Sequence, residues 1–157
     1  MVRLKIEGSF VVDAPRETVW RYITDPEHVG PSLPGCEEIE VISPELYKAT
    51  VKVGVGPIKA KFKLDVEITE ERFPEFVETL TRGEEGGRAS SVTAHNELRL
   101  TDLEDGSTEV SYLSDVNIVG RLGKFGLGVM KKIANKLGKQ FAATLTERIK
   151  AAEGVES

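Results

Sequence analysis

The sequence is poor in the residue types that most often carry chemistry. Its 157 residues include one cysteine, two histidines and one tryptophan. The single cysteine, Cys36, excludes an internal disulfide and fits a reducing compartment, so we expect a cytoplasmic protein. Cys36 has no histidine or second cysteine at ligand spacing, so neither a metal site nor a cofactor is expected. His28 and His95 stand far apart and neither forms a recognisable triad, so no catalytic residue is predicted.

Long apolar runs are missing as well. No stretch of about eighteen apolar residues occurs, so no membrane-spanning helix is predicted. A strand pattern begins at residue 2, so no signal peptide is expected. A net charge of −5 and a pI near 5.2 make nucleic acid a poor candidate partner. The length fits a single domain over residues 1–157.

The sequence does contain a regular succession of strand signals, in which apolar and polar residues alternate. The predicted strands span residues 2–12, 37–43, 47–55, 58–68, 76–83, 89–103 and 107–119. After the first strand, Pro15 and Pro26 each stand where a short helix would begin. An amphipathic helix is predicted over about residues 120–151.

This order of elements predicts an α+β fold, because strands and helices fall in separate blocks. One bent antiparallel sheet of seven strands must bury its apolar face. The C-terminal helix, at roughly 45 Å for about thirty residues, is the only predicted element long enough to cover it.

Small and polar residues interrupt the face that is expected to meet this helix. Ala94, Asn96 and Ser114 alternate with larger apolar side chains, which would leave the interior partly hollow. A mainly apolar wall with a few polar groups is typical of a ligand pocket. The predicted cavity lining is Phe62, Leu64, Val92, Ala94, Asn96, Tyr112, Ser114, Val116, Leu122, Gly126, Val129, Met130 and Ile133.

The start of the predicted helix is rich in glycine, at Gly120, Gly123, Gly126 and Gly128. Each glycine inside a helix costs about 1 kcal/mol relative to alanine. Two interpretations remain open. The glycines allow close packing, or form a loop that delays the helix until about Phe125. Alternatively, they keep space and flexibility for a ligand, and the first turn acts as a gate.

One segment of this acidic chain contains no acid. Residues 116–146 carry six basic side chains, which a helix would place on one flank. These are Arg121, Lys124, Lys131, Lys132, Lys136 and Lys139. Three interpretations remain open. The basic residues form a solvated face, or they attract anionic lipid headgroups at about 1 kcal/mol per residue, or they dock to an acidic partner protein. The chain ends soon after the helix, so any membrane contact is expected to be reversible.

Two motifs carry a resemblance to a known family. They are Pro34-Gly35-Cys36-Glu37 and the stretch Val-Lys-Val-Gly-Val-Gly-Pro-Ile-Lys-Ala-Lys-Phe over residues 51–62. With the glycine-bearing helix, they make the chain similar to the CoxG family of carbon monoxide dehydrogenase subunits, within the START-like, or SRPBCC, superfamily. The similarity extends over about residues 3–148. It implies a helix-grip (START/Bet v 1-like) fold, in which a seven-stranded antiparallel sheet grips the C-terminal helix around a deep hydrophobic cavity.

The resemblance also implies a function. Members of the family are expected to bind lipid-like or quinone-like molecules without catalysis, and to assist the membrane recruitment or maturation of a molybdenum hydroxylase such as CO dehydrogenase. This chain would then lie at the inner face of the membrane as a peripheral protein. The alternative is a polyketide cyclase- or hydratase-like enzyme that uses the same cavity. For that alternative, Tyr112 and Asn96 are the only candidate residues.

Overall fold

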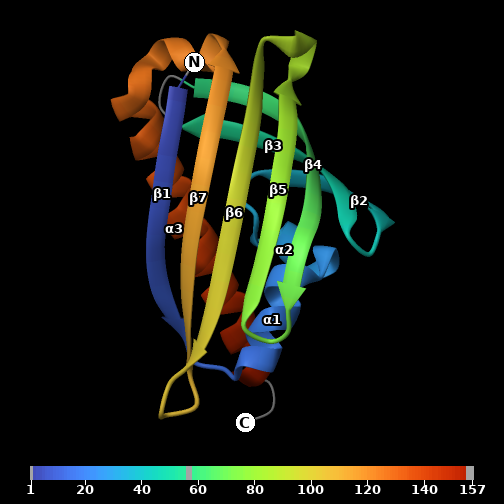
Figure 1. Cartoon of the computed structure of the whole chain (residues 1–157), viewed down its shortest axis with the longest axis vertical. Coiled ribbons are helices and arrows are strands. Elements are labelled where there is room, and N and C mark those ends of the chain that lie inside the picture. The colour runs from blue at the N-terminus through green and yellow to red at the C-terminus, as the bar shows by residue number, and fades with distance from the viewer. Residues whose placement is uncertain (1, 56–57, 155–157) are drawn as a thin grey trace.

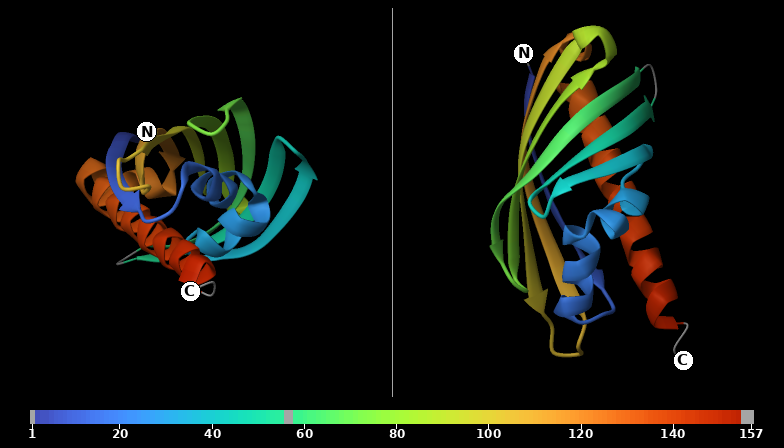
Figure 2. Two further views of the ribbon diagram at one scale, coloured as in Figure 1. Left: turned by 90° about the horizontal axis from the view of Figure 1, so that it is seen from below. Right: turned by 90° about the vertical axis from the view of Figure 1, so that its right-hand side faces the viewer.

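Seven antiparallel strands form one sheet that curves around a long C-terminal helix (Figures 1 and 2). The computed structural model describes residues 2–55 and 58–154. The elements are β1 (Val2–Val12), α1 (Arg16–Thr24), α2 (Pro26–Ser32), β2 (Cys36–Ser43), β3 (Leu46–Val55), β4 (Ile58–Arg72), β5 (Phe76–Glu85), η1 (Gly86–Arg88), β6 (Ser90–Asp102), β7 (Thr108–Gly120), η2 (Arg121–Phe125) and α3 (Gly126–Gly154). The predicted α+β helix-grip fold, with two short helices after the first strand, is confirmed.

The strand order in the sheet is β1-β7-β6-β5-β4-β3-β2, and every neighbouring pair is antiparallel. Chain neighbours therefore pair with each other, except that β1 pairs with β7. The predicted strands match the observed ones closely, although β4 continues to Arg72. Gly56 and Pro57, between the predicted strands 47–55 and 58–68, where a turn would connect them, lie outside the described residues.

The long helix begins later than predicted. A short 3-10 turn, η2, occupies residues 121–125, and α3 starts only at Gly126. The backbone of Gly126 has φ +84°, a left-handed value that favours glycine and ends the 3-10 turn. The structure thus bears out the interpretation of a loop that delays the helix.

Two separate hydrophobic cores hold α3 against the concave face of the sheet. The lower core lies where the C-terminal half of α3 meets α1 (Figure 1). It contains Val12, Ala14, Val19, Trp20, Tyr22, Ile23, Val77, Leu100, Val110, Leu145 and Ile149. The upper core lies at the N-terminal half of α3 and contains Val2, Leu4, Ala60, Phe62, Ile118, Leu122, Met130 and Ile133.

The Pro34-Gly35-Cys36 turn is fixed against β3. Gly35 has φ +77°, and its carbonyl accepts a hydrogen bond of 2.8 Å from the backbone N–H of Lys52. A side chain at residue 35 would collide with the carbonyl oxygen of Lys52. The backbone conformation and the close approach both require glycine at this position.

We therefore expect Gly35→Ala to lower the free energy of unfolding by about 2 kcal/mol or more, from left-handed strain plus the clash. Urea unfolding followed by circular dichroism would measure the change. Gly54→Ala on β3 is the matched control, because a Cβ there meets open space at an ordinary φ. Equal stability of the two variants would contradict this account of the turn.

Candidate ligand-binding site

The region between the two cores is only partly buried on both of its walls. On α3, Ile133 and Leu145 are buried, whereas no residue from 134 to 144 is. On the sheet, the residues of β6 and β7 that face this stretch are half-buried. They are Val92, Ala94, Asn96, Leu98, Tyr112, Ser114 and Val116. Side chains on a concave face keep contact with solvent only where the covering element leaves room, so we infer from this burial pattern a gap between sheet and helix, which we call the hollow.

The predicted lining residues fall into three groups. Phe62, Leu122, Met130 and Ile133 are packed into the upper core. A second group is half-buried and consists of Leu64, Val92, Ala94, Asn96, Tyr112, Ser114, Val116 and Gly126. The first group closes the upper end of the hollow. All of the second group except Gly126, which begins α3, lie on the inner face of the sheet.

Val129 forms the third group, and its predicted placement needs correction. Val129 is 39% exposed, and together with Lys131 and Lys132 it lines a pocket on the outer surface of α3. It lies one residue before the buried Met130, a step of about 100° around the helix, which carries it off the inner face.

A hydrogen-bonded polar cluster crosses the middle of the inner wall. The Asn96 amide Nδ2 donates to Thr79 Oγ1 at 3.1 Å and to Thr81 Oγ1 at 3.3 Å. The Ser114 hydroxyl donates to Asn96 Oδ1 at 2.7 Å. The cluster therefore joins β5, β6 and β7. We call these four side chains the polar belt.

Sequence reasoning found Asn96 and Ser114 but missed the two threonines of the belt. Thr79 and Thr81 continue the alternation that begins at Val77, whose side chain lies in the lower core. That alternation was available as a signal. It is obscured by Phe76, which is also buried, between the guanidinium groups of Arg72 and Arg99 at 4.4 and 4.6 Å from the ring centroid.

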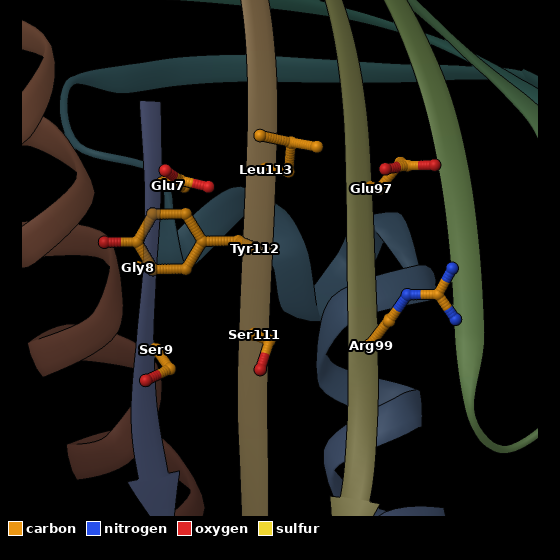
Figure 3. Close-up of a pocket in the computed structure, with 8 residues that line it drawn as sticks. All are labelled: Glu7, Gly8, Ser9, Glu97, Arg99, Ser111, Tyr112 and Leu113. Atoms are coloured by element: carbon orange, nitrogen blue, oxygen red, sulfur yellow. The ribbon is translucent and has the colours of Figure 1, made fainter. Parts of the chain in front are cut away.

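Tyr112 crosses from β7 to cover Gly8 on β1 (Figure 3). A Cβ at residue 8 would lie 2.7 Å from the Tyr112 ring, so only glycine leaves space for the aromatic side chain. The pocket drawn around Gly8 and Tyr112 is lined mainly by residues next to inner-face positions in the sequence, including Glu7, Glu97 and Arg99. These alternate with the inner-face residues, so this surface pocket is distinct from the predicted cavity.

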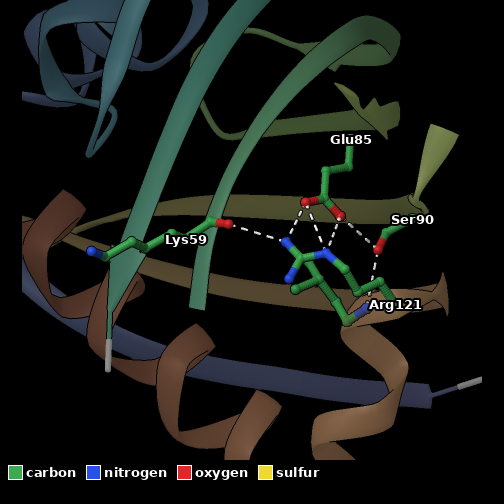
Figure 4. A network of polar contacts seen from close by, with 5 residues as sticks. Lys59, Glu85, Ser90 and Arg121 are labelled. Carbon is green, nitrogen blue, oxygen red and sulfur yellow. Dashed lines mark hydrogen bonds and ion pairs between the residues drawn. The ribbon is translucent and has the colours of Figure 1, made fainter. Parts of the chain in front are cut away.

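A buried carboxylate fixes the segment that leads into α3 (Figure 4). Glu85 is 8% exposed and accepts hydrogen bonds from Ser90 Oγ at 2.9 Å and from Arg121 Nε at 3.2 Å. Arg121 Nη2 forms an ion pair with Glu85 and donates to the carbonyl oxygen of Lys59 at 3.0 Å. Ser90 Oγ in turn accepts from the backbone N–H of Leu122 at 3.0 Å. This Glu85–Arg121 network ties β4, β5 and β6 to η2.

The electrostatics of this network follow from its hydrogen bonds. Those from Arg121 lower the pKa of Glu85, with a smaller contribution from Ser90, against the opposing effect of burial. The same contact raises the pKa of Arg121. The sequence predicts that Arg121 shares the basic flank of the helix with the lysines. That prediction is wrong, because Arg121 lies in η2 and pairs with Glu85. Its partner lies 36 residues away in the chain, beyond the reach of a helical pattern.

The five remaining basic residues of the predicted face are exposed. They are Lys124, Lys131, Lys132, Lys136 and Lys139. Among residues 2–55 and 58–154, none of them has an ion-pair partner. Two large apolar side chains near the start of α3, Leu127 at 54% and Val129 at 39%, are exposed beside them. We call these seven residues the basic face.

The described part of the chain has neither a candidate metal site nor a candidate membrane-spanning helix. It contains no group of three or more histidine, cysteine, aspartate or glutamate side chains that could hold a metal ion. Within the same residues, no helix has the length and apolar character needed to cross a membrane. Burial raises the pKa of the Cys36 thiol, which favours the protonated and less nucleophilic form.

A strongly curved antiparallel sheet that holds a C-terminal helix across a half-buried inner wall is a START-like fold. The model of the CoxG family, described as a carbon monoxide dehydrogenase subunit, matches residues 8–150, so the chain belongs to that family. A search among curated proteins finds no match.

Solved structures share the fold over nearly the whole chain. A conserved protein from Geobacillus kaustophilus is 26% identical with a TM-score of 0.89, covering 95% of this chain and 97% of that one. A START superfamily protein from Mycobacterium smegmatis is 16% identical with a TM-score of 0.72, covering 94% and 98%. The ZhuI aromatase/cyclase from Streptomyces sp. R1128 is 13% identical with a TM-score of 0.63, covering 96% and 93%. The last two likenesses concern the fold alone.

We expect Glu85→Gln to destabilise the protein by roughly 1–3 kcal/mol near neutral pH, because Arg121 loses its charged partner. The lowered pKa of Glu85 means that its stabilisation is present above the pKa of an unfolded glutamate and is lost as pH falls through the folded-state value. The variant should therefore lose less stability on acidification than the wild type.

Urea unfolding at a series of pH values would measure this difference. Glu37→Gln is the control, since Glu37 pairs with Lys61 at 3.1 Å on the surface, where an ion pair contributes little. A Glu85→Gln variant as stable as the wild type at neutral pH would contradict the assigned role of the network.

Proposed function

We propose that this protein is a non-catalytic carrier of a hydrophobic small molecule, lipid-like or quinone-like. The ligand would lie between the middle of α3 and the inner face of the sheet. The observation that carries the proposal is the half-buried wall between two buried cores, since a protein with no guest would gain stability by closing such a gap. Membership of the CoxG family and the START-like fold support it.

The composition of the wall favours binding over catalysis. Between the cores, the described inner-face positions of β1, β5, β6 and β7 carry no carboxylate, histidine or cysteine. Asn96, one of the two candidates for an enzymatic role, uses its amide hydrogens on Thr79 and Thr81. The other, Tyr112, has no described hydrogen-bond partner that could act as a base. A cyclase-like enzyme remains the alternative use of the same space.

A second role is favoured by the basic face. We propose that it makes reversible contact with an anionic membrane at the cytoplasmic side, and so assists the recruitment or maturation of a CO dehydrogenase-type molybdenum hydroxylase. Lysines that have no ion-pair partner in the described part of the chain, next to exposed apolar side chains, fit a membrane with negative headgroups and an apolar interior.

The carrier proposal predicts that filling the hollow abolishes binding. Ala94→Phe places a large ring on the half-buried inner face of β6, where we expect at least a tenfold loss of affinity for lipophilic compounds with no loss of thermal stability. Thr93→Phe, on the exposed face of the same strand, is the control.

Protein purified from its native host should also release a lipid or isoprenoid quinone on extraction, as detected by mass spectrometry. No bound compound, together with no thermal shift from any lipophile, would end the proposal.

The membrane proposal predicts binding to vesicles that contain phosphatidylglycerol, weakening as salt is added. Changing Lys131, Lys132, Lys136 and Lys139 to glutamate should reduce this binding at least a hundredfold, given about 1 kcal/mol per lysine. The same change at the exposed Lys5, Lys52, Lys59 and Lys63 alters the net charge equally and should have a much smaller effect. Sedimentation with vesicles would measure both. Equal losses in the two variants would mean that net charge alone drives the contact.

A further inference from the structure

The polar belt lies between apolar surfaces on both sides. In the next row of the sheet towards α1, Val77 belongs to the lower core and its partner Leu98 packs against that core. On the other side, Val92 and Val116 pack against the upper core. Thr79, Asn96 and Ser114 occupy directly opposed positions on β5, β6 and β7, so the belt forms a line across the wall.

The belt has hydrogen-bonding capacity that the protein does not use. Its amide and three hydroxyl groups offer more donor hydrogens than the three hydrogen bonds that join them, in either orientation of the amide. The Tyr112 hydroxyl, in the adjacent row, adds another donor without a partner among the described residues. All of these side chains are half-buried, so a molecule in the hollow could reach them.

The belt is also uncharged. Neither lysine nor arginine stands on the inner face of β1, β5, β6 or β7 between the cores within the described residues. An anion buried there would lose its hydration without gaining a counter-charge, which is costly. A neutral oxygen would lose much less and would gain hydrogen bonds from the spare hydroxyl groups.

The part of α3 that faces the belt carries several small residues. Gly138 stands opposite, and a Cβ built there would lie 3.8 Å from the Tyr112 hydroxyl oxygen. Its neighbours along the helix on this side include Ala134 and Ala142, which are small. The two large side chains of this stretch, Leu137 and Phe141, pack against the upper and the lower core respectively.

We propose that the polar belt, with Tyr112, binds an uncharged oxygen of the ligand, a carbonyl or a hydroxyl, while apolar parts of the same molecule extend towards both cores. The ligand class is thus a neutral amphiphile and excludes fatty-acid carboxylates and phospholipids. This inference rests on the proposed carrier function and specifies its ligand.

The test uses two fluorescent probes. Laurdan carries a ketone between a naphthalene ring and an eleven-carbon alkyl chain, and its emission shifts to the red when the ketone accepts hydrogen bonds. N-phenyl-1-naphthylamine is apolar and contains no oxygen. Wild-type protein should bind both, with red-shifted Laurdan emission.

The variant to compare removes the belt without opening a large cavity, because its replacements are apolar and close in shape to the original side chains. It combines Thr79→Val, Thr81→Val, Asn96→Leu and Ser114→Ala. We expect about tenfold weaker binding of Laurdan with blue-shifted emission, and unchanged binding of N-phenyl-1-naphthylamine. Ser91→Ala with Thr93→Val, on the exposed face of β6, is the control and should bind both probes as the wild type does. If the fourfold variant fails to fold, Thr79→Val alone should show a smaller change in the same direction.

The outcomes separate this inference from the carrier function. Wild-type protein that binds neither probe would overturn both. Binding of both probes, with Laurdan affinity and emission unchanged in the belt variant, would overturn the belt alone, and so would an equal loss of both probes. The anionic probe cis-parinarate should bind at least tenfold more weakly than Laurdan above the pKa of its carboxyl group. Equal affinity, blocked in both cases by Ala94→Phe, would overturn the assignment to neutral ligands.

Discussion

The structure depends on how one long helix covers one curved sheet. The helix α3 has 29 residues, about 43 Å of length, and its buried residues are concentrated at two places rather than along its whole face. Leu145 and Ile149 are fully buried near α1, and Met130 and Ile133 are buried at the other end. Between these two places, the residues of α3 that face the sheet are only half-buried. The hollow therefore follows from this geometry and from the small residues at its centre.

The upper attachment combines apolar packing with a charged network. Leu122 anchors η2 in the upper core, and Arg121 beside it binds Glu85 and the carbonyl oxygen of Lys59. A carboxylate this deeply buried requires its partners, because an unpaired charge there would be strongly destabilising. The network thus sets where the chain leaves β7 and where α3 begins. The exposed Leu127 lies just beyond it, so the proposed membrane contact would act on the end of the helix that this network holds.

Much of this architecture could be predicted from local patterns. The alternation over residues 58–68 indicates β4, and the segregated order of elements indicates an α+β fold, because both depend on short-range periodicity. The start of α3 could not be placed, since η2 and α3 share one apolar periodicity and only the backbone of Gly126 separates them. Arg121 was misplaced for a different reason, as its partner Glu85 comes from a distant strand. The belt threonines were missed because both faces of β5 carry buried residues at its start.

The polar belt has no evident role in holding the fold together. The register of β5, β6 and β7 is already set by uninterrupted backbone ladders and by apolar residues on either side. Valine, leucine and alanine at these positions would pack the wall more tightly and would avoid the cost of partly burying amide and hydroxyl groups. A polar network with spare donors in an otherwise apolar wall is thus unfavourable for an empty protein. It becomes favourable when a guest supplies the missing acceptors, so the belt bears more on the ligand than on the scaffold.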